Sequence, residues 1–320
     1  MGKKGHRKHH YIPQCYLRNF SSNGKSLWTY DKLNSKIYSS AIDNICCIDE
    51  FYTLPEGCVN KYNDERKNQL FVECDFFAEN IESQYDYMLQ KIISNKDKWI
   101  GNPEQLAITN EEKLLFAKHI AIQWMRTPSQ REKLLKMNYD IISQEMEIFK
   151  AFFAYTENNP EYLKTDIKFE TNAPLLHAQM IFDNHELISS FAEAICSNYW
   201  EFSVSEIGDI YTSDYPIVVE PHVQGAPQFY DGLASYGSES SFPISKNIVL
   251  TIWDKEYFTD KSGLDCKFVM LDEKEKRRKN LHRYFYARRH LYCSENCFVI
   301  IEREKYLNEG SHIFMGNSKK

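Results

Sequence analysis

The sequence predicts an α+β fold in a single domain, with antiparallel strands at both ends of the chain around a central set of long helices. Short aromatic-rich stretches between turn residues occupy residues 26–57 and return after residue 199. Between them, residues 64–197 carry apolar residues at spacings of three and four, which indicates helices. Strands, then helices, then strands again are typical of α+β rather than of a regularly wound parallel sheet.

Composition limits the classes of function. The chain of 320 residues is 42% hydrophobic and long enough to bury a large core. Its net charge of −6 argues against a surface that binds nucleic acid everywhere, so a polyanion would need a local basic patch. Nine scattered cysteines without a C-x-x-C pair, and the absence of a signal peptide or of an apolar run of about eighteen residues, predict a soluble cytoplasmic protein with no membrane partner.

The amino-terminal region divides into a basic tail, residues 1–8, and the start of the domain, residues 9–305; residues 306–320 form a carboxy-terminal tail. Three strands are predicted after a Ser-Ser-Asn-Gly turn, at residues 26–32, 35–42 and 49–57.

The helical middle begins with a helix over residues 64–98. A second helix begins at Thr109, because Thr109 and Glu112 have the spacing of a capping box, and it ends at Arg126 before Thr127-Pro128. A third runs from Ser129 to Tyr155. Residues 156–174 are rich in turn formers and predict a linker, and a further helix follows over residues 174–197.

The second half returns to strands. They are predicted at residues 199–205, 210–214, 216–220, 241–245, 247–253, 266–271 and 297–303, with a basic helix over residues 273–290. Residues 221–240 form a long loop, either a lid or binding loop or plain disorder. The basic helix is favoured as a solvated surface, and a phosphate-facing patch is the alternative.

The helix over residues 109–126 is apolar almost all round, which implies burial, yet it carries one polar stripe of Glu112, His119, Gln123 and Arg126. Buried polar groups need partners. The favoured interpretation is an internal polar network. The alternative is a ligand pocket in which Arg126 binds an anion, His119 or Gln123 orients it, and Arg131 adds a second guanidinium.

Two further segments carry candidate chemistry. Thr212, Ser213 and Asp214 end a strand before a Tyr-Pro pair, where Asp214 could be a general base or metal ligand, although capping its own turn is favoured. His9 and His10 lie in an extended segment, so at most one of them faces a given site. No P-loop, G-x-G-x-x-G, H-E-x-x-H or G-x-S-x-G motif is present.

Read in order, "HHYIPQCYLRNF", "QWMRTPSQR", "IYTSDYPIVV", "FPIS" and the asparagine of "KNLHRYFYARRHLYCS" resemble the bacterial family of domain of unknown function 4238. This family has no established activity to carry over. The resemblance implies a grouping of polar motif residues in one pocket, where histidine and arginine would meet an anion: His9, His10, Arg18, Gln123, Arg126, Arg131 and Asp214.

These patterns lead to one hypothesis and two alternatives. The hypothesis is a phosphoester-cleaving enzyme, nuclease-like, in a bacterial toxin or phage-defence setting, with a divalent metal as a candidate cofactor. Its catalytic candidates are His9, His10 and Asp214, and its substrate-binding candidates are Arg18, His119, Gln123, Arg126, Arg131, Thr212 and Ser213. The alternatives are a non-catalytic nucleotide- or nucleic-acid-binding module that uses a basic patch, and a purely structural polar core.

Overall fold

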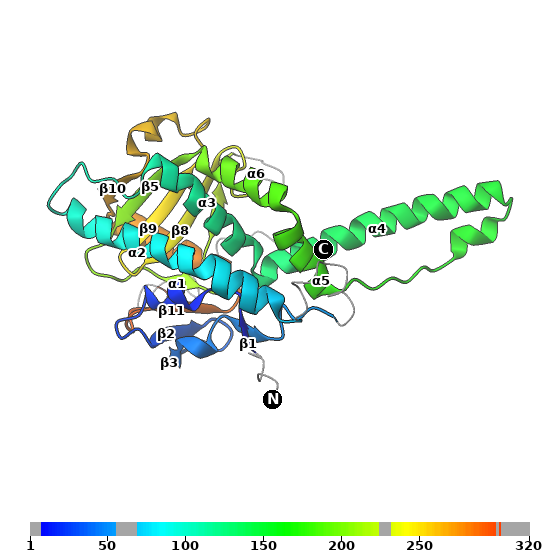
Figure 1. Cartoon of the computed structure of the whole chain (residues 1–320), viewed down its shortest axis with the longest axis horizontal. Helices are drawn as coiled ribbons and strands as arrows, with labels where there is room; N and C mark the ends of the chain where they lie inside the picture. Colours follow the sequence, from blue (N-terminus) through cyan, green and yellow to red (C-terminus); the bar gives the residue numbers. More distant parts are fainter. Residues whose placement is uncertain (1–7, 56–68, 224–231, 299–300, 302–320) are drawn as a thin grey trace, which may run out of the picture.

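The computed structural model describes residues 8–55, 69–223, 232–298 and 301. It is a mixed α/β structure with several sheets. Figure 1 shows a body in which helices cover a central sheet, and one long helix that projects away from that body. Within the described residues, no helix is long and apolar enough to cross a membrane.

The largest sheet of the described chain has five strands in the order β10-β5-β9-β8-β7. The strands are β5 (Tyr199–Val204), β7 (Val218–Pro221), β8 (Ser238–Ser245), β9 (Ile248–Trp253) and β10 (Lys267–Met270). All neighbours pair antiparallel except β10 and β5, which pair in parallel. The prediction of antiparallel strands is therefore wrong at this edge, where β10 enters after a long connection from β9 rather than a hairpin.

A second sheet has the order β3-β2-β11-β6 and joins the two ends of the chain. Its strands are β2 (Ser26–Asp31), β3 (Lys36–Ala41), β6 (Thr212–Ser213) and β11 (His290–Cys293). The amino-terminal hairpin of β2 and β3 thus pairs with β11, antiparallel, from Asp31 opposite His290 to Trp28 opposite Cys293. A short pair of β1 (Lys8–His10) and β4 (Cys47–Asp49) lies beside it.

The helices follow the predicted apolar spacing in the middle of the chain. They are α1 (Gln14–Arg18), α2 (Glu82–Trp99), α3 (Asn110–Met125), α4 (Pro128–Thr156), α5 (Ala173–Ala178), α6 (His185–Cys196) and α7 (Glu273–Tyr286), with π-helical segments at Val72–Ile81 and Gln179–Asp183. The predicted capping box is confirmed, since Thr109 accepts from the Glu112 amide and Glu112 accepts from the Thr109 amide. In Figure 1, α2, α3 and α6 lie over the five-stranded sheet.

Several local predictions are wrong. Residues 50–52 form a turn that begins with the positive φ of Glu50, residues 53–55 have no regular structure, and residues 56 and 57 lie outside the described part. The helix predicted over residues 174–197 breaks at Asn184, whose side chain caps α6 instead. Residues 297 and 298 are not a strand, and most of that segment lies outside the described residues. Leu114 and Leu115 are exposed, so α3 is not buried all round.

The amino-terminal segment enters the main core. Ile12, Tyr16, Leu17 and Phe20 are fully buried and belong to the same apolar cluster as residues of α2, α3 and the five-stranded sheet. The Tyr16 ring stacks on Phe242 of β8, with ring centroids 5.3 Å apart. This anchoring fixes the backbone of His9 and His10 at the edge of the core.

Candidate functional site

The strand β1 turns its two histidines in different directions. His9 is fully buried, stacks on the Tyr52 ring and accepts a 2.9 Å hydrogen bond at Nδ1 from the Tyr52 amide. His10 is only half-buried. The expectation that at most one of them faces a site agrees with this arrangement, and His10 is the one.

His10 lines an open cavity of about 590 Å³, which we call the N-terminal cleft. Its volume is in the range of small-molecule sites. The walls come from β1, α1, the turn after β3, the π-helical segment and the start of α2. They bring together six acidic, basic or imidazole side chains: Lys8, His10, Arg18, Asp43, Glu73 and Glu82.

Glu73 is the carboxyl with the most unusual environment in this cleft. Burial raises its pKa to about 7, although the nearby Arg126 guanidinium and the His10 amide act in the opposite direction. The His10 amide donates to Oε1 at 3.2 Å, whereas Oε2 has no hydrogen-bond partner in the described structure. A carboxyl in this state exchanges a proton near neutral pH. Glu73 is not among the residues predicted for a site, because nothing in the surrounding sequence distinguishes it from the other acids there.

The pKa of His10 is shifted in the direction opposite to that of Glu73. Burial lowers the pKa of its ring, Glu82 raises it in part, and Arg126 lowers it further. Its Nε2 lies 3.4 Å from Gln14 Nε2, and Gln14 Oε1 accepts from Arg18 at 3.0 Å. The spacing of four residues places Gln14 and Arg18 on one face of α1, so that a polar chain leads from the imidazole to an exposed guanidinium.

Arg126 supports the cleft from behind and is not part of its wall. Its side chain is 1% exposed, stacks over the Phe77 ring at 3.8 Å, and donates to the His10 carbonyl at 2.5 Å. It also donates to Glu82 at 3.3 Å. One turn earlier, Gln123 donates to the Tyr11 carbonyl at 3.3 Å. Two members of the predicted polar stripe therefore hold two consecutive backbone carbonyls, those of His10 and Tyr11.

Other predicted site residues lie outside the cleft walls. Arg131 stacks over Phe51 and donates from Nε to His177 Nδ1 at 2.9 Å, and His177 donates to the Met125 carbonyl at 2.8 Å. Burial lowers the pKa of Arg131 to about 10. Burial, together with the nearby positive charge of Arg131, lowers the pKa of His177 to about 3. His119 stacks on Tyr85, and burial lowers its pKa to about 4. These side chains form internal contacts.

The segment at residues 212–214 is structural. The Asp214 carboxylate accepts three backbone amides, those of Arg288 and Arg289 at 2.8 Å and that of His290 at 2.9 Å. Thr212 pairs with the Tyr16 hydroxyl at 2.7 Å, and Ser213 closes a turn with Tyr215. Asp214 is thus not among the residues that line the cleft with His10, because β6 places it against the chain that leads into β11.

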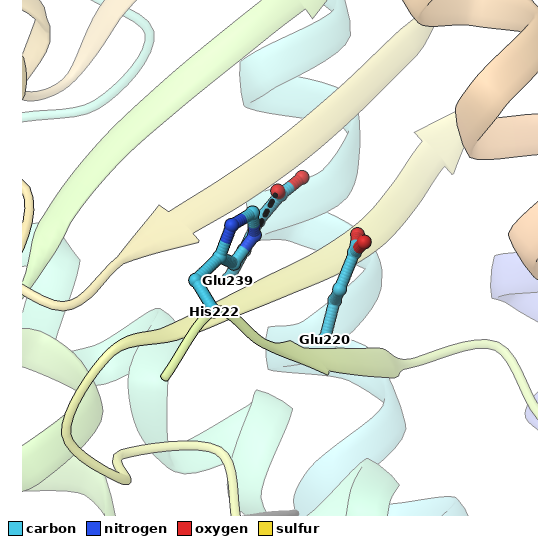
Figure 2. Close-up of side chains that lie close together, drawn as sticks. All are labelled: Glu220, His222 and Glu239. Carbon is cyan, nitrogen blue, oxygen red and sulfur yellow. Dashed lines mark hydrogen bonds and ion pairs between the residues drawn. The ribbon is translucent and has the colours of Figure 1, made fainter. Parts of the chain in front are cut away.

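A second cluster lies over β7 and β8. Glu220, His222 and Glu239 point toward one another (Figure 2), and one ligand atom from each lies within 4.8 Å of the others. They line a hollow of about 510 Å³ and could hold a metal ion. Their carboxylates already have side-chain partners: Arg278 contacts both, His282 contacts Glu220 at 3.0 Å, and Lys279 contacts Glu239 at 3.0 Å.

The same contacts pair several basic side chains of α7 with carboxylates inside the protein. Burial opposes ionisation of Glu239, but Lys279 and Arg278 outweigh it and lower the pKa of Glu239 to about 2. Lys276 binds Asp209 at 2.8 Å, and Arg283 donates to the Ser241 carbonyl at 2.8 Å. The buried cations of this helix thus have internal partners, which agrees poorly with a phosphate-facing patch made from them.

Comparison with known proteins adds one finding. A family model described as "Protein of unknown function (DUF4238)" matches residues 8–296. No curated protein and no solved structure matches the chain.

Proposed function

Because the chain belongs to the DUF4238 family, whose description assigns no activity, we propose its function from the N-terminal cleft: hydrolysis of a phosphoester, with His10 and Glu73 as the proton-transfer groups. The observation that carries the proposal is the pair itself. One cavity holds an imidazole and a carboxyl whose pKa values are moved in opposite directions, so that they approach or cross each other.

The shifted pKa values assign the roles. A lowered pKa leaves the His10 ring neutral at pH 7, where it can take a proton from an attacking water. A pKa of about 7 leaves Glu73 partly protonated, so it can donate to the leaving oxygen. Arg126 is a positioning residue here, because it holds the His10 carbonyl and Glu82 without reaching the cavity.

Two cationic side chains on the cleft wall favour an anionic group in the substrate. Lys8 and Arg18 lie on the cleft wall, and their charges suit a phosphate that develops negative charge during attack. The volume of the cleft fits a nucleotide or the end of a nucleic-acid strand. The divalent metal expected from the sequence has a separate candidate place at Glu220, His222 and Glu239, and the proposed proton transfer does not depend on it.

The test is hydrolysis of bis(p-nitrophenyl) phosphate, nucleotides and a short single-stranded RNA by the full chain. We expect His10→Ala and Glu73→Gln each to lower kcat about a hundredfold or more while thermal unfolding shows folded protein. His185→Ala and Glu186→Gln, exposed on α6, are matched controls and should keep full activity. The wild-type rate should peak between the lowered pKa of His10 and about pH 7.

Two results would change the conclusion. Full activity in both cleft variants would remove the assigned roles. Nucleotide binding without turnover, lost in Arg18→Ala, would replace the enzyme with the binding module and locate that module in the cleft rather than on α7.

A further inference from the structure

The helix α4 carries a second apolar face that nothing in the described chain covers. It extends away from the body in Figure 1, and the segment that follows it returns alongside. That return packs on one face only: Tyr139 stacks with Phe169 at 5.1 Å, Phe153 with Tyr162 at 5.9 Å, and Thr171 donates to Asn138 at 3.1 Å. At about 100° per residue, Tyr139 and Phe153 lie a third of a turn or more from the centre of the uncovered face, whereas Asn138 lies beside its edge.

The uncovered face has the spacing of a helix–helix interface. Leu134, Ile141, Ile148 and Tyr155 recur every seven residues, and Met137 and Phe152 lie between them on the same side. Five of these six side chains are solvent-exposed, among them Ile141 at 48%, Ile148 at 69% and Tyr155 at 87%, and Leu134 is partly buried. Contiguous exposed apolar surface of this kind marks an interaction site.

The order of residues along the face indicates which partner fits. Measured from the midpoint between Gln144 and Glu145, apolar residues recur at equal distances in both directions: Ile141 and Ile148, Met137 and Phe152, Leu134 and Tyr155. A pattern that is unchanged when read backwards is complementary to its own antiparallel copy. A two-fold contact requires this self-complementarity, because residue i meets residue j while j meets i.

We propose that the protein forms a two-fold dimer through antiparallel packing of α4 against α4 of a second copy, centred near Gln144. Five exposed apolar side chains per helix, of which Phe152 and Tyr155 are aromatic with on the order of 150–250 Å² each, supply a large part of the roughly 800 Å² per partner of a stable interface. Charge disfavours an anionic lipid surface as the occupant, because residues 132–172 contain eight acids against five lysines.

The test is the mass of the full chain in solution, measured by sedimentation and light scattering at micromolar concentration. Wild type should have twice the mass of the chain. Ile148→Glu should weaken the dimer about a hundredfold or more, because it buries an unpaired charge. Ile207→Glu, at a position 73% exposed in the body, is the matched control and should stay dimeric.

A second arm tests the antiparallel arrangement. Ile141 of one helix lies beside Ile148 of the other, so Ile141→Lys combined with Ile148→Glu in one chain should restore the dimer that each single change weakens. A parallel pair would place like charges together and stay weakened. A monomeric wild type, or Ile148→Glu that dimerises normally, would overturn the proposal, and neither result depends on activity in the N-terminal cleft.

Discussion

Glu73 and His10 owe their shifted pKa values to the same cause, which is partial burial in the wall of one cleft. Removing water penalises whichever form carries charge, so the acid becomes weaker and the imidazolium becomes stronger as an acid. The Arg126 guanidinium has a smaller effect and lowers the pKa of both groups, because a nearby cation favours loss of the proton. At the scale of single residues, desolvation therefore brings two ordinary side chains into the range needed for proton transfer near neutral pH.

The free energy of unfolding should depend on whether the Glu73 carboxyl is protonated. Its pKa is raised from 4.5 to about 7, so the folded chain binds this proton more tightly, and stability falls as pH rises from about 4.5 to about 7. Glu73→Gln keeps an acceptor for the His10 amide but removes the charge. We expect it to stabilise the protein by on the order of 2 kcal/mol at pH 8 and to have little effect at pH 4.

Thermal unfolding at pH 4, 6 and 8 measures this difference. Glu186→Gln, exposed on α6, should show no such pH dependence. A Glu73→Gln effect of equal size at every pH would contradict a buried carboxyl that titrates near neutrality.

The helix α3 shows how one element positions the site without lining it. Its capping box fixes where the helix begins, and its polar stripe then meets the amino-terminal segment at Gln123 and Arg126. One turn before Gln123, the His119 ring stacks on Tyr85, and neither of its ring nitrogens has a hydrogen-bond partner in the described structure. The stripe is thus part internal network and part support for the cleft, and Arg126 does not line the cleft as the ligand-pocket interpretation required.

Removing the cap tests the element. Thr109→Ala should lower the free energy of unfolding by about 1 kcal/mol, because the Glu112 amide loses its acceptor. Thr109→Ser should keep most of the stability. Urea unfolding measures both changes, and equal stability of the alanine and serine variants would show that the capping box contributes nothing.

At the scale of the whole molecule, the sheet β3-β2-β11-β6 ties the first strands of the chain to its last described strand. Asp214 lies at this junction, where its carboxylate gathers the amides of Arg288, Arg289 and His290 before β11 begins. The Arg289 side chain reaches Asp31 of β2 at 2.8 Å. A residue selected from the sequence as a candidate base thus serves to close the fold.

Asp214→Ala should therefore cost stability rather than chemistry. It leaves three amides without their acceptor, and we expect a loss of about 3 kcal/mol or more, with unchanged kcat per folded molecule below the unfolding temperature. Asp166→Ala is the control, because Asp166 is exposed in the segment between α4 and α5. Loss of kcat at full stability would return Asp214 to the catalytic candidates.

The sequence by itself determined the local features: the start of α3 at Thr109, the break at Pro128, and the strands β2 and β3. Capping, proline geometry and apolar spacing act over a few residues, so they can be read from neighbours in the chain. Only the tertiary structure decided that Glu73 and Glu82 face His10 while Asp214 does not, and that β11 pairs with β2. Those contacts join residues far apart in sequence, and their distances depend on how the whole core packs.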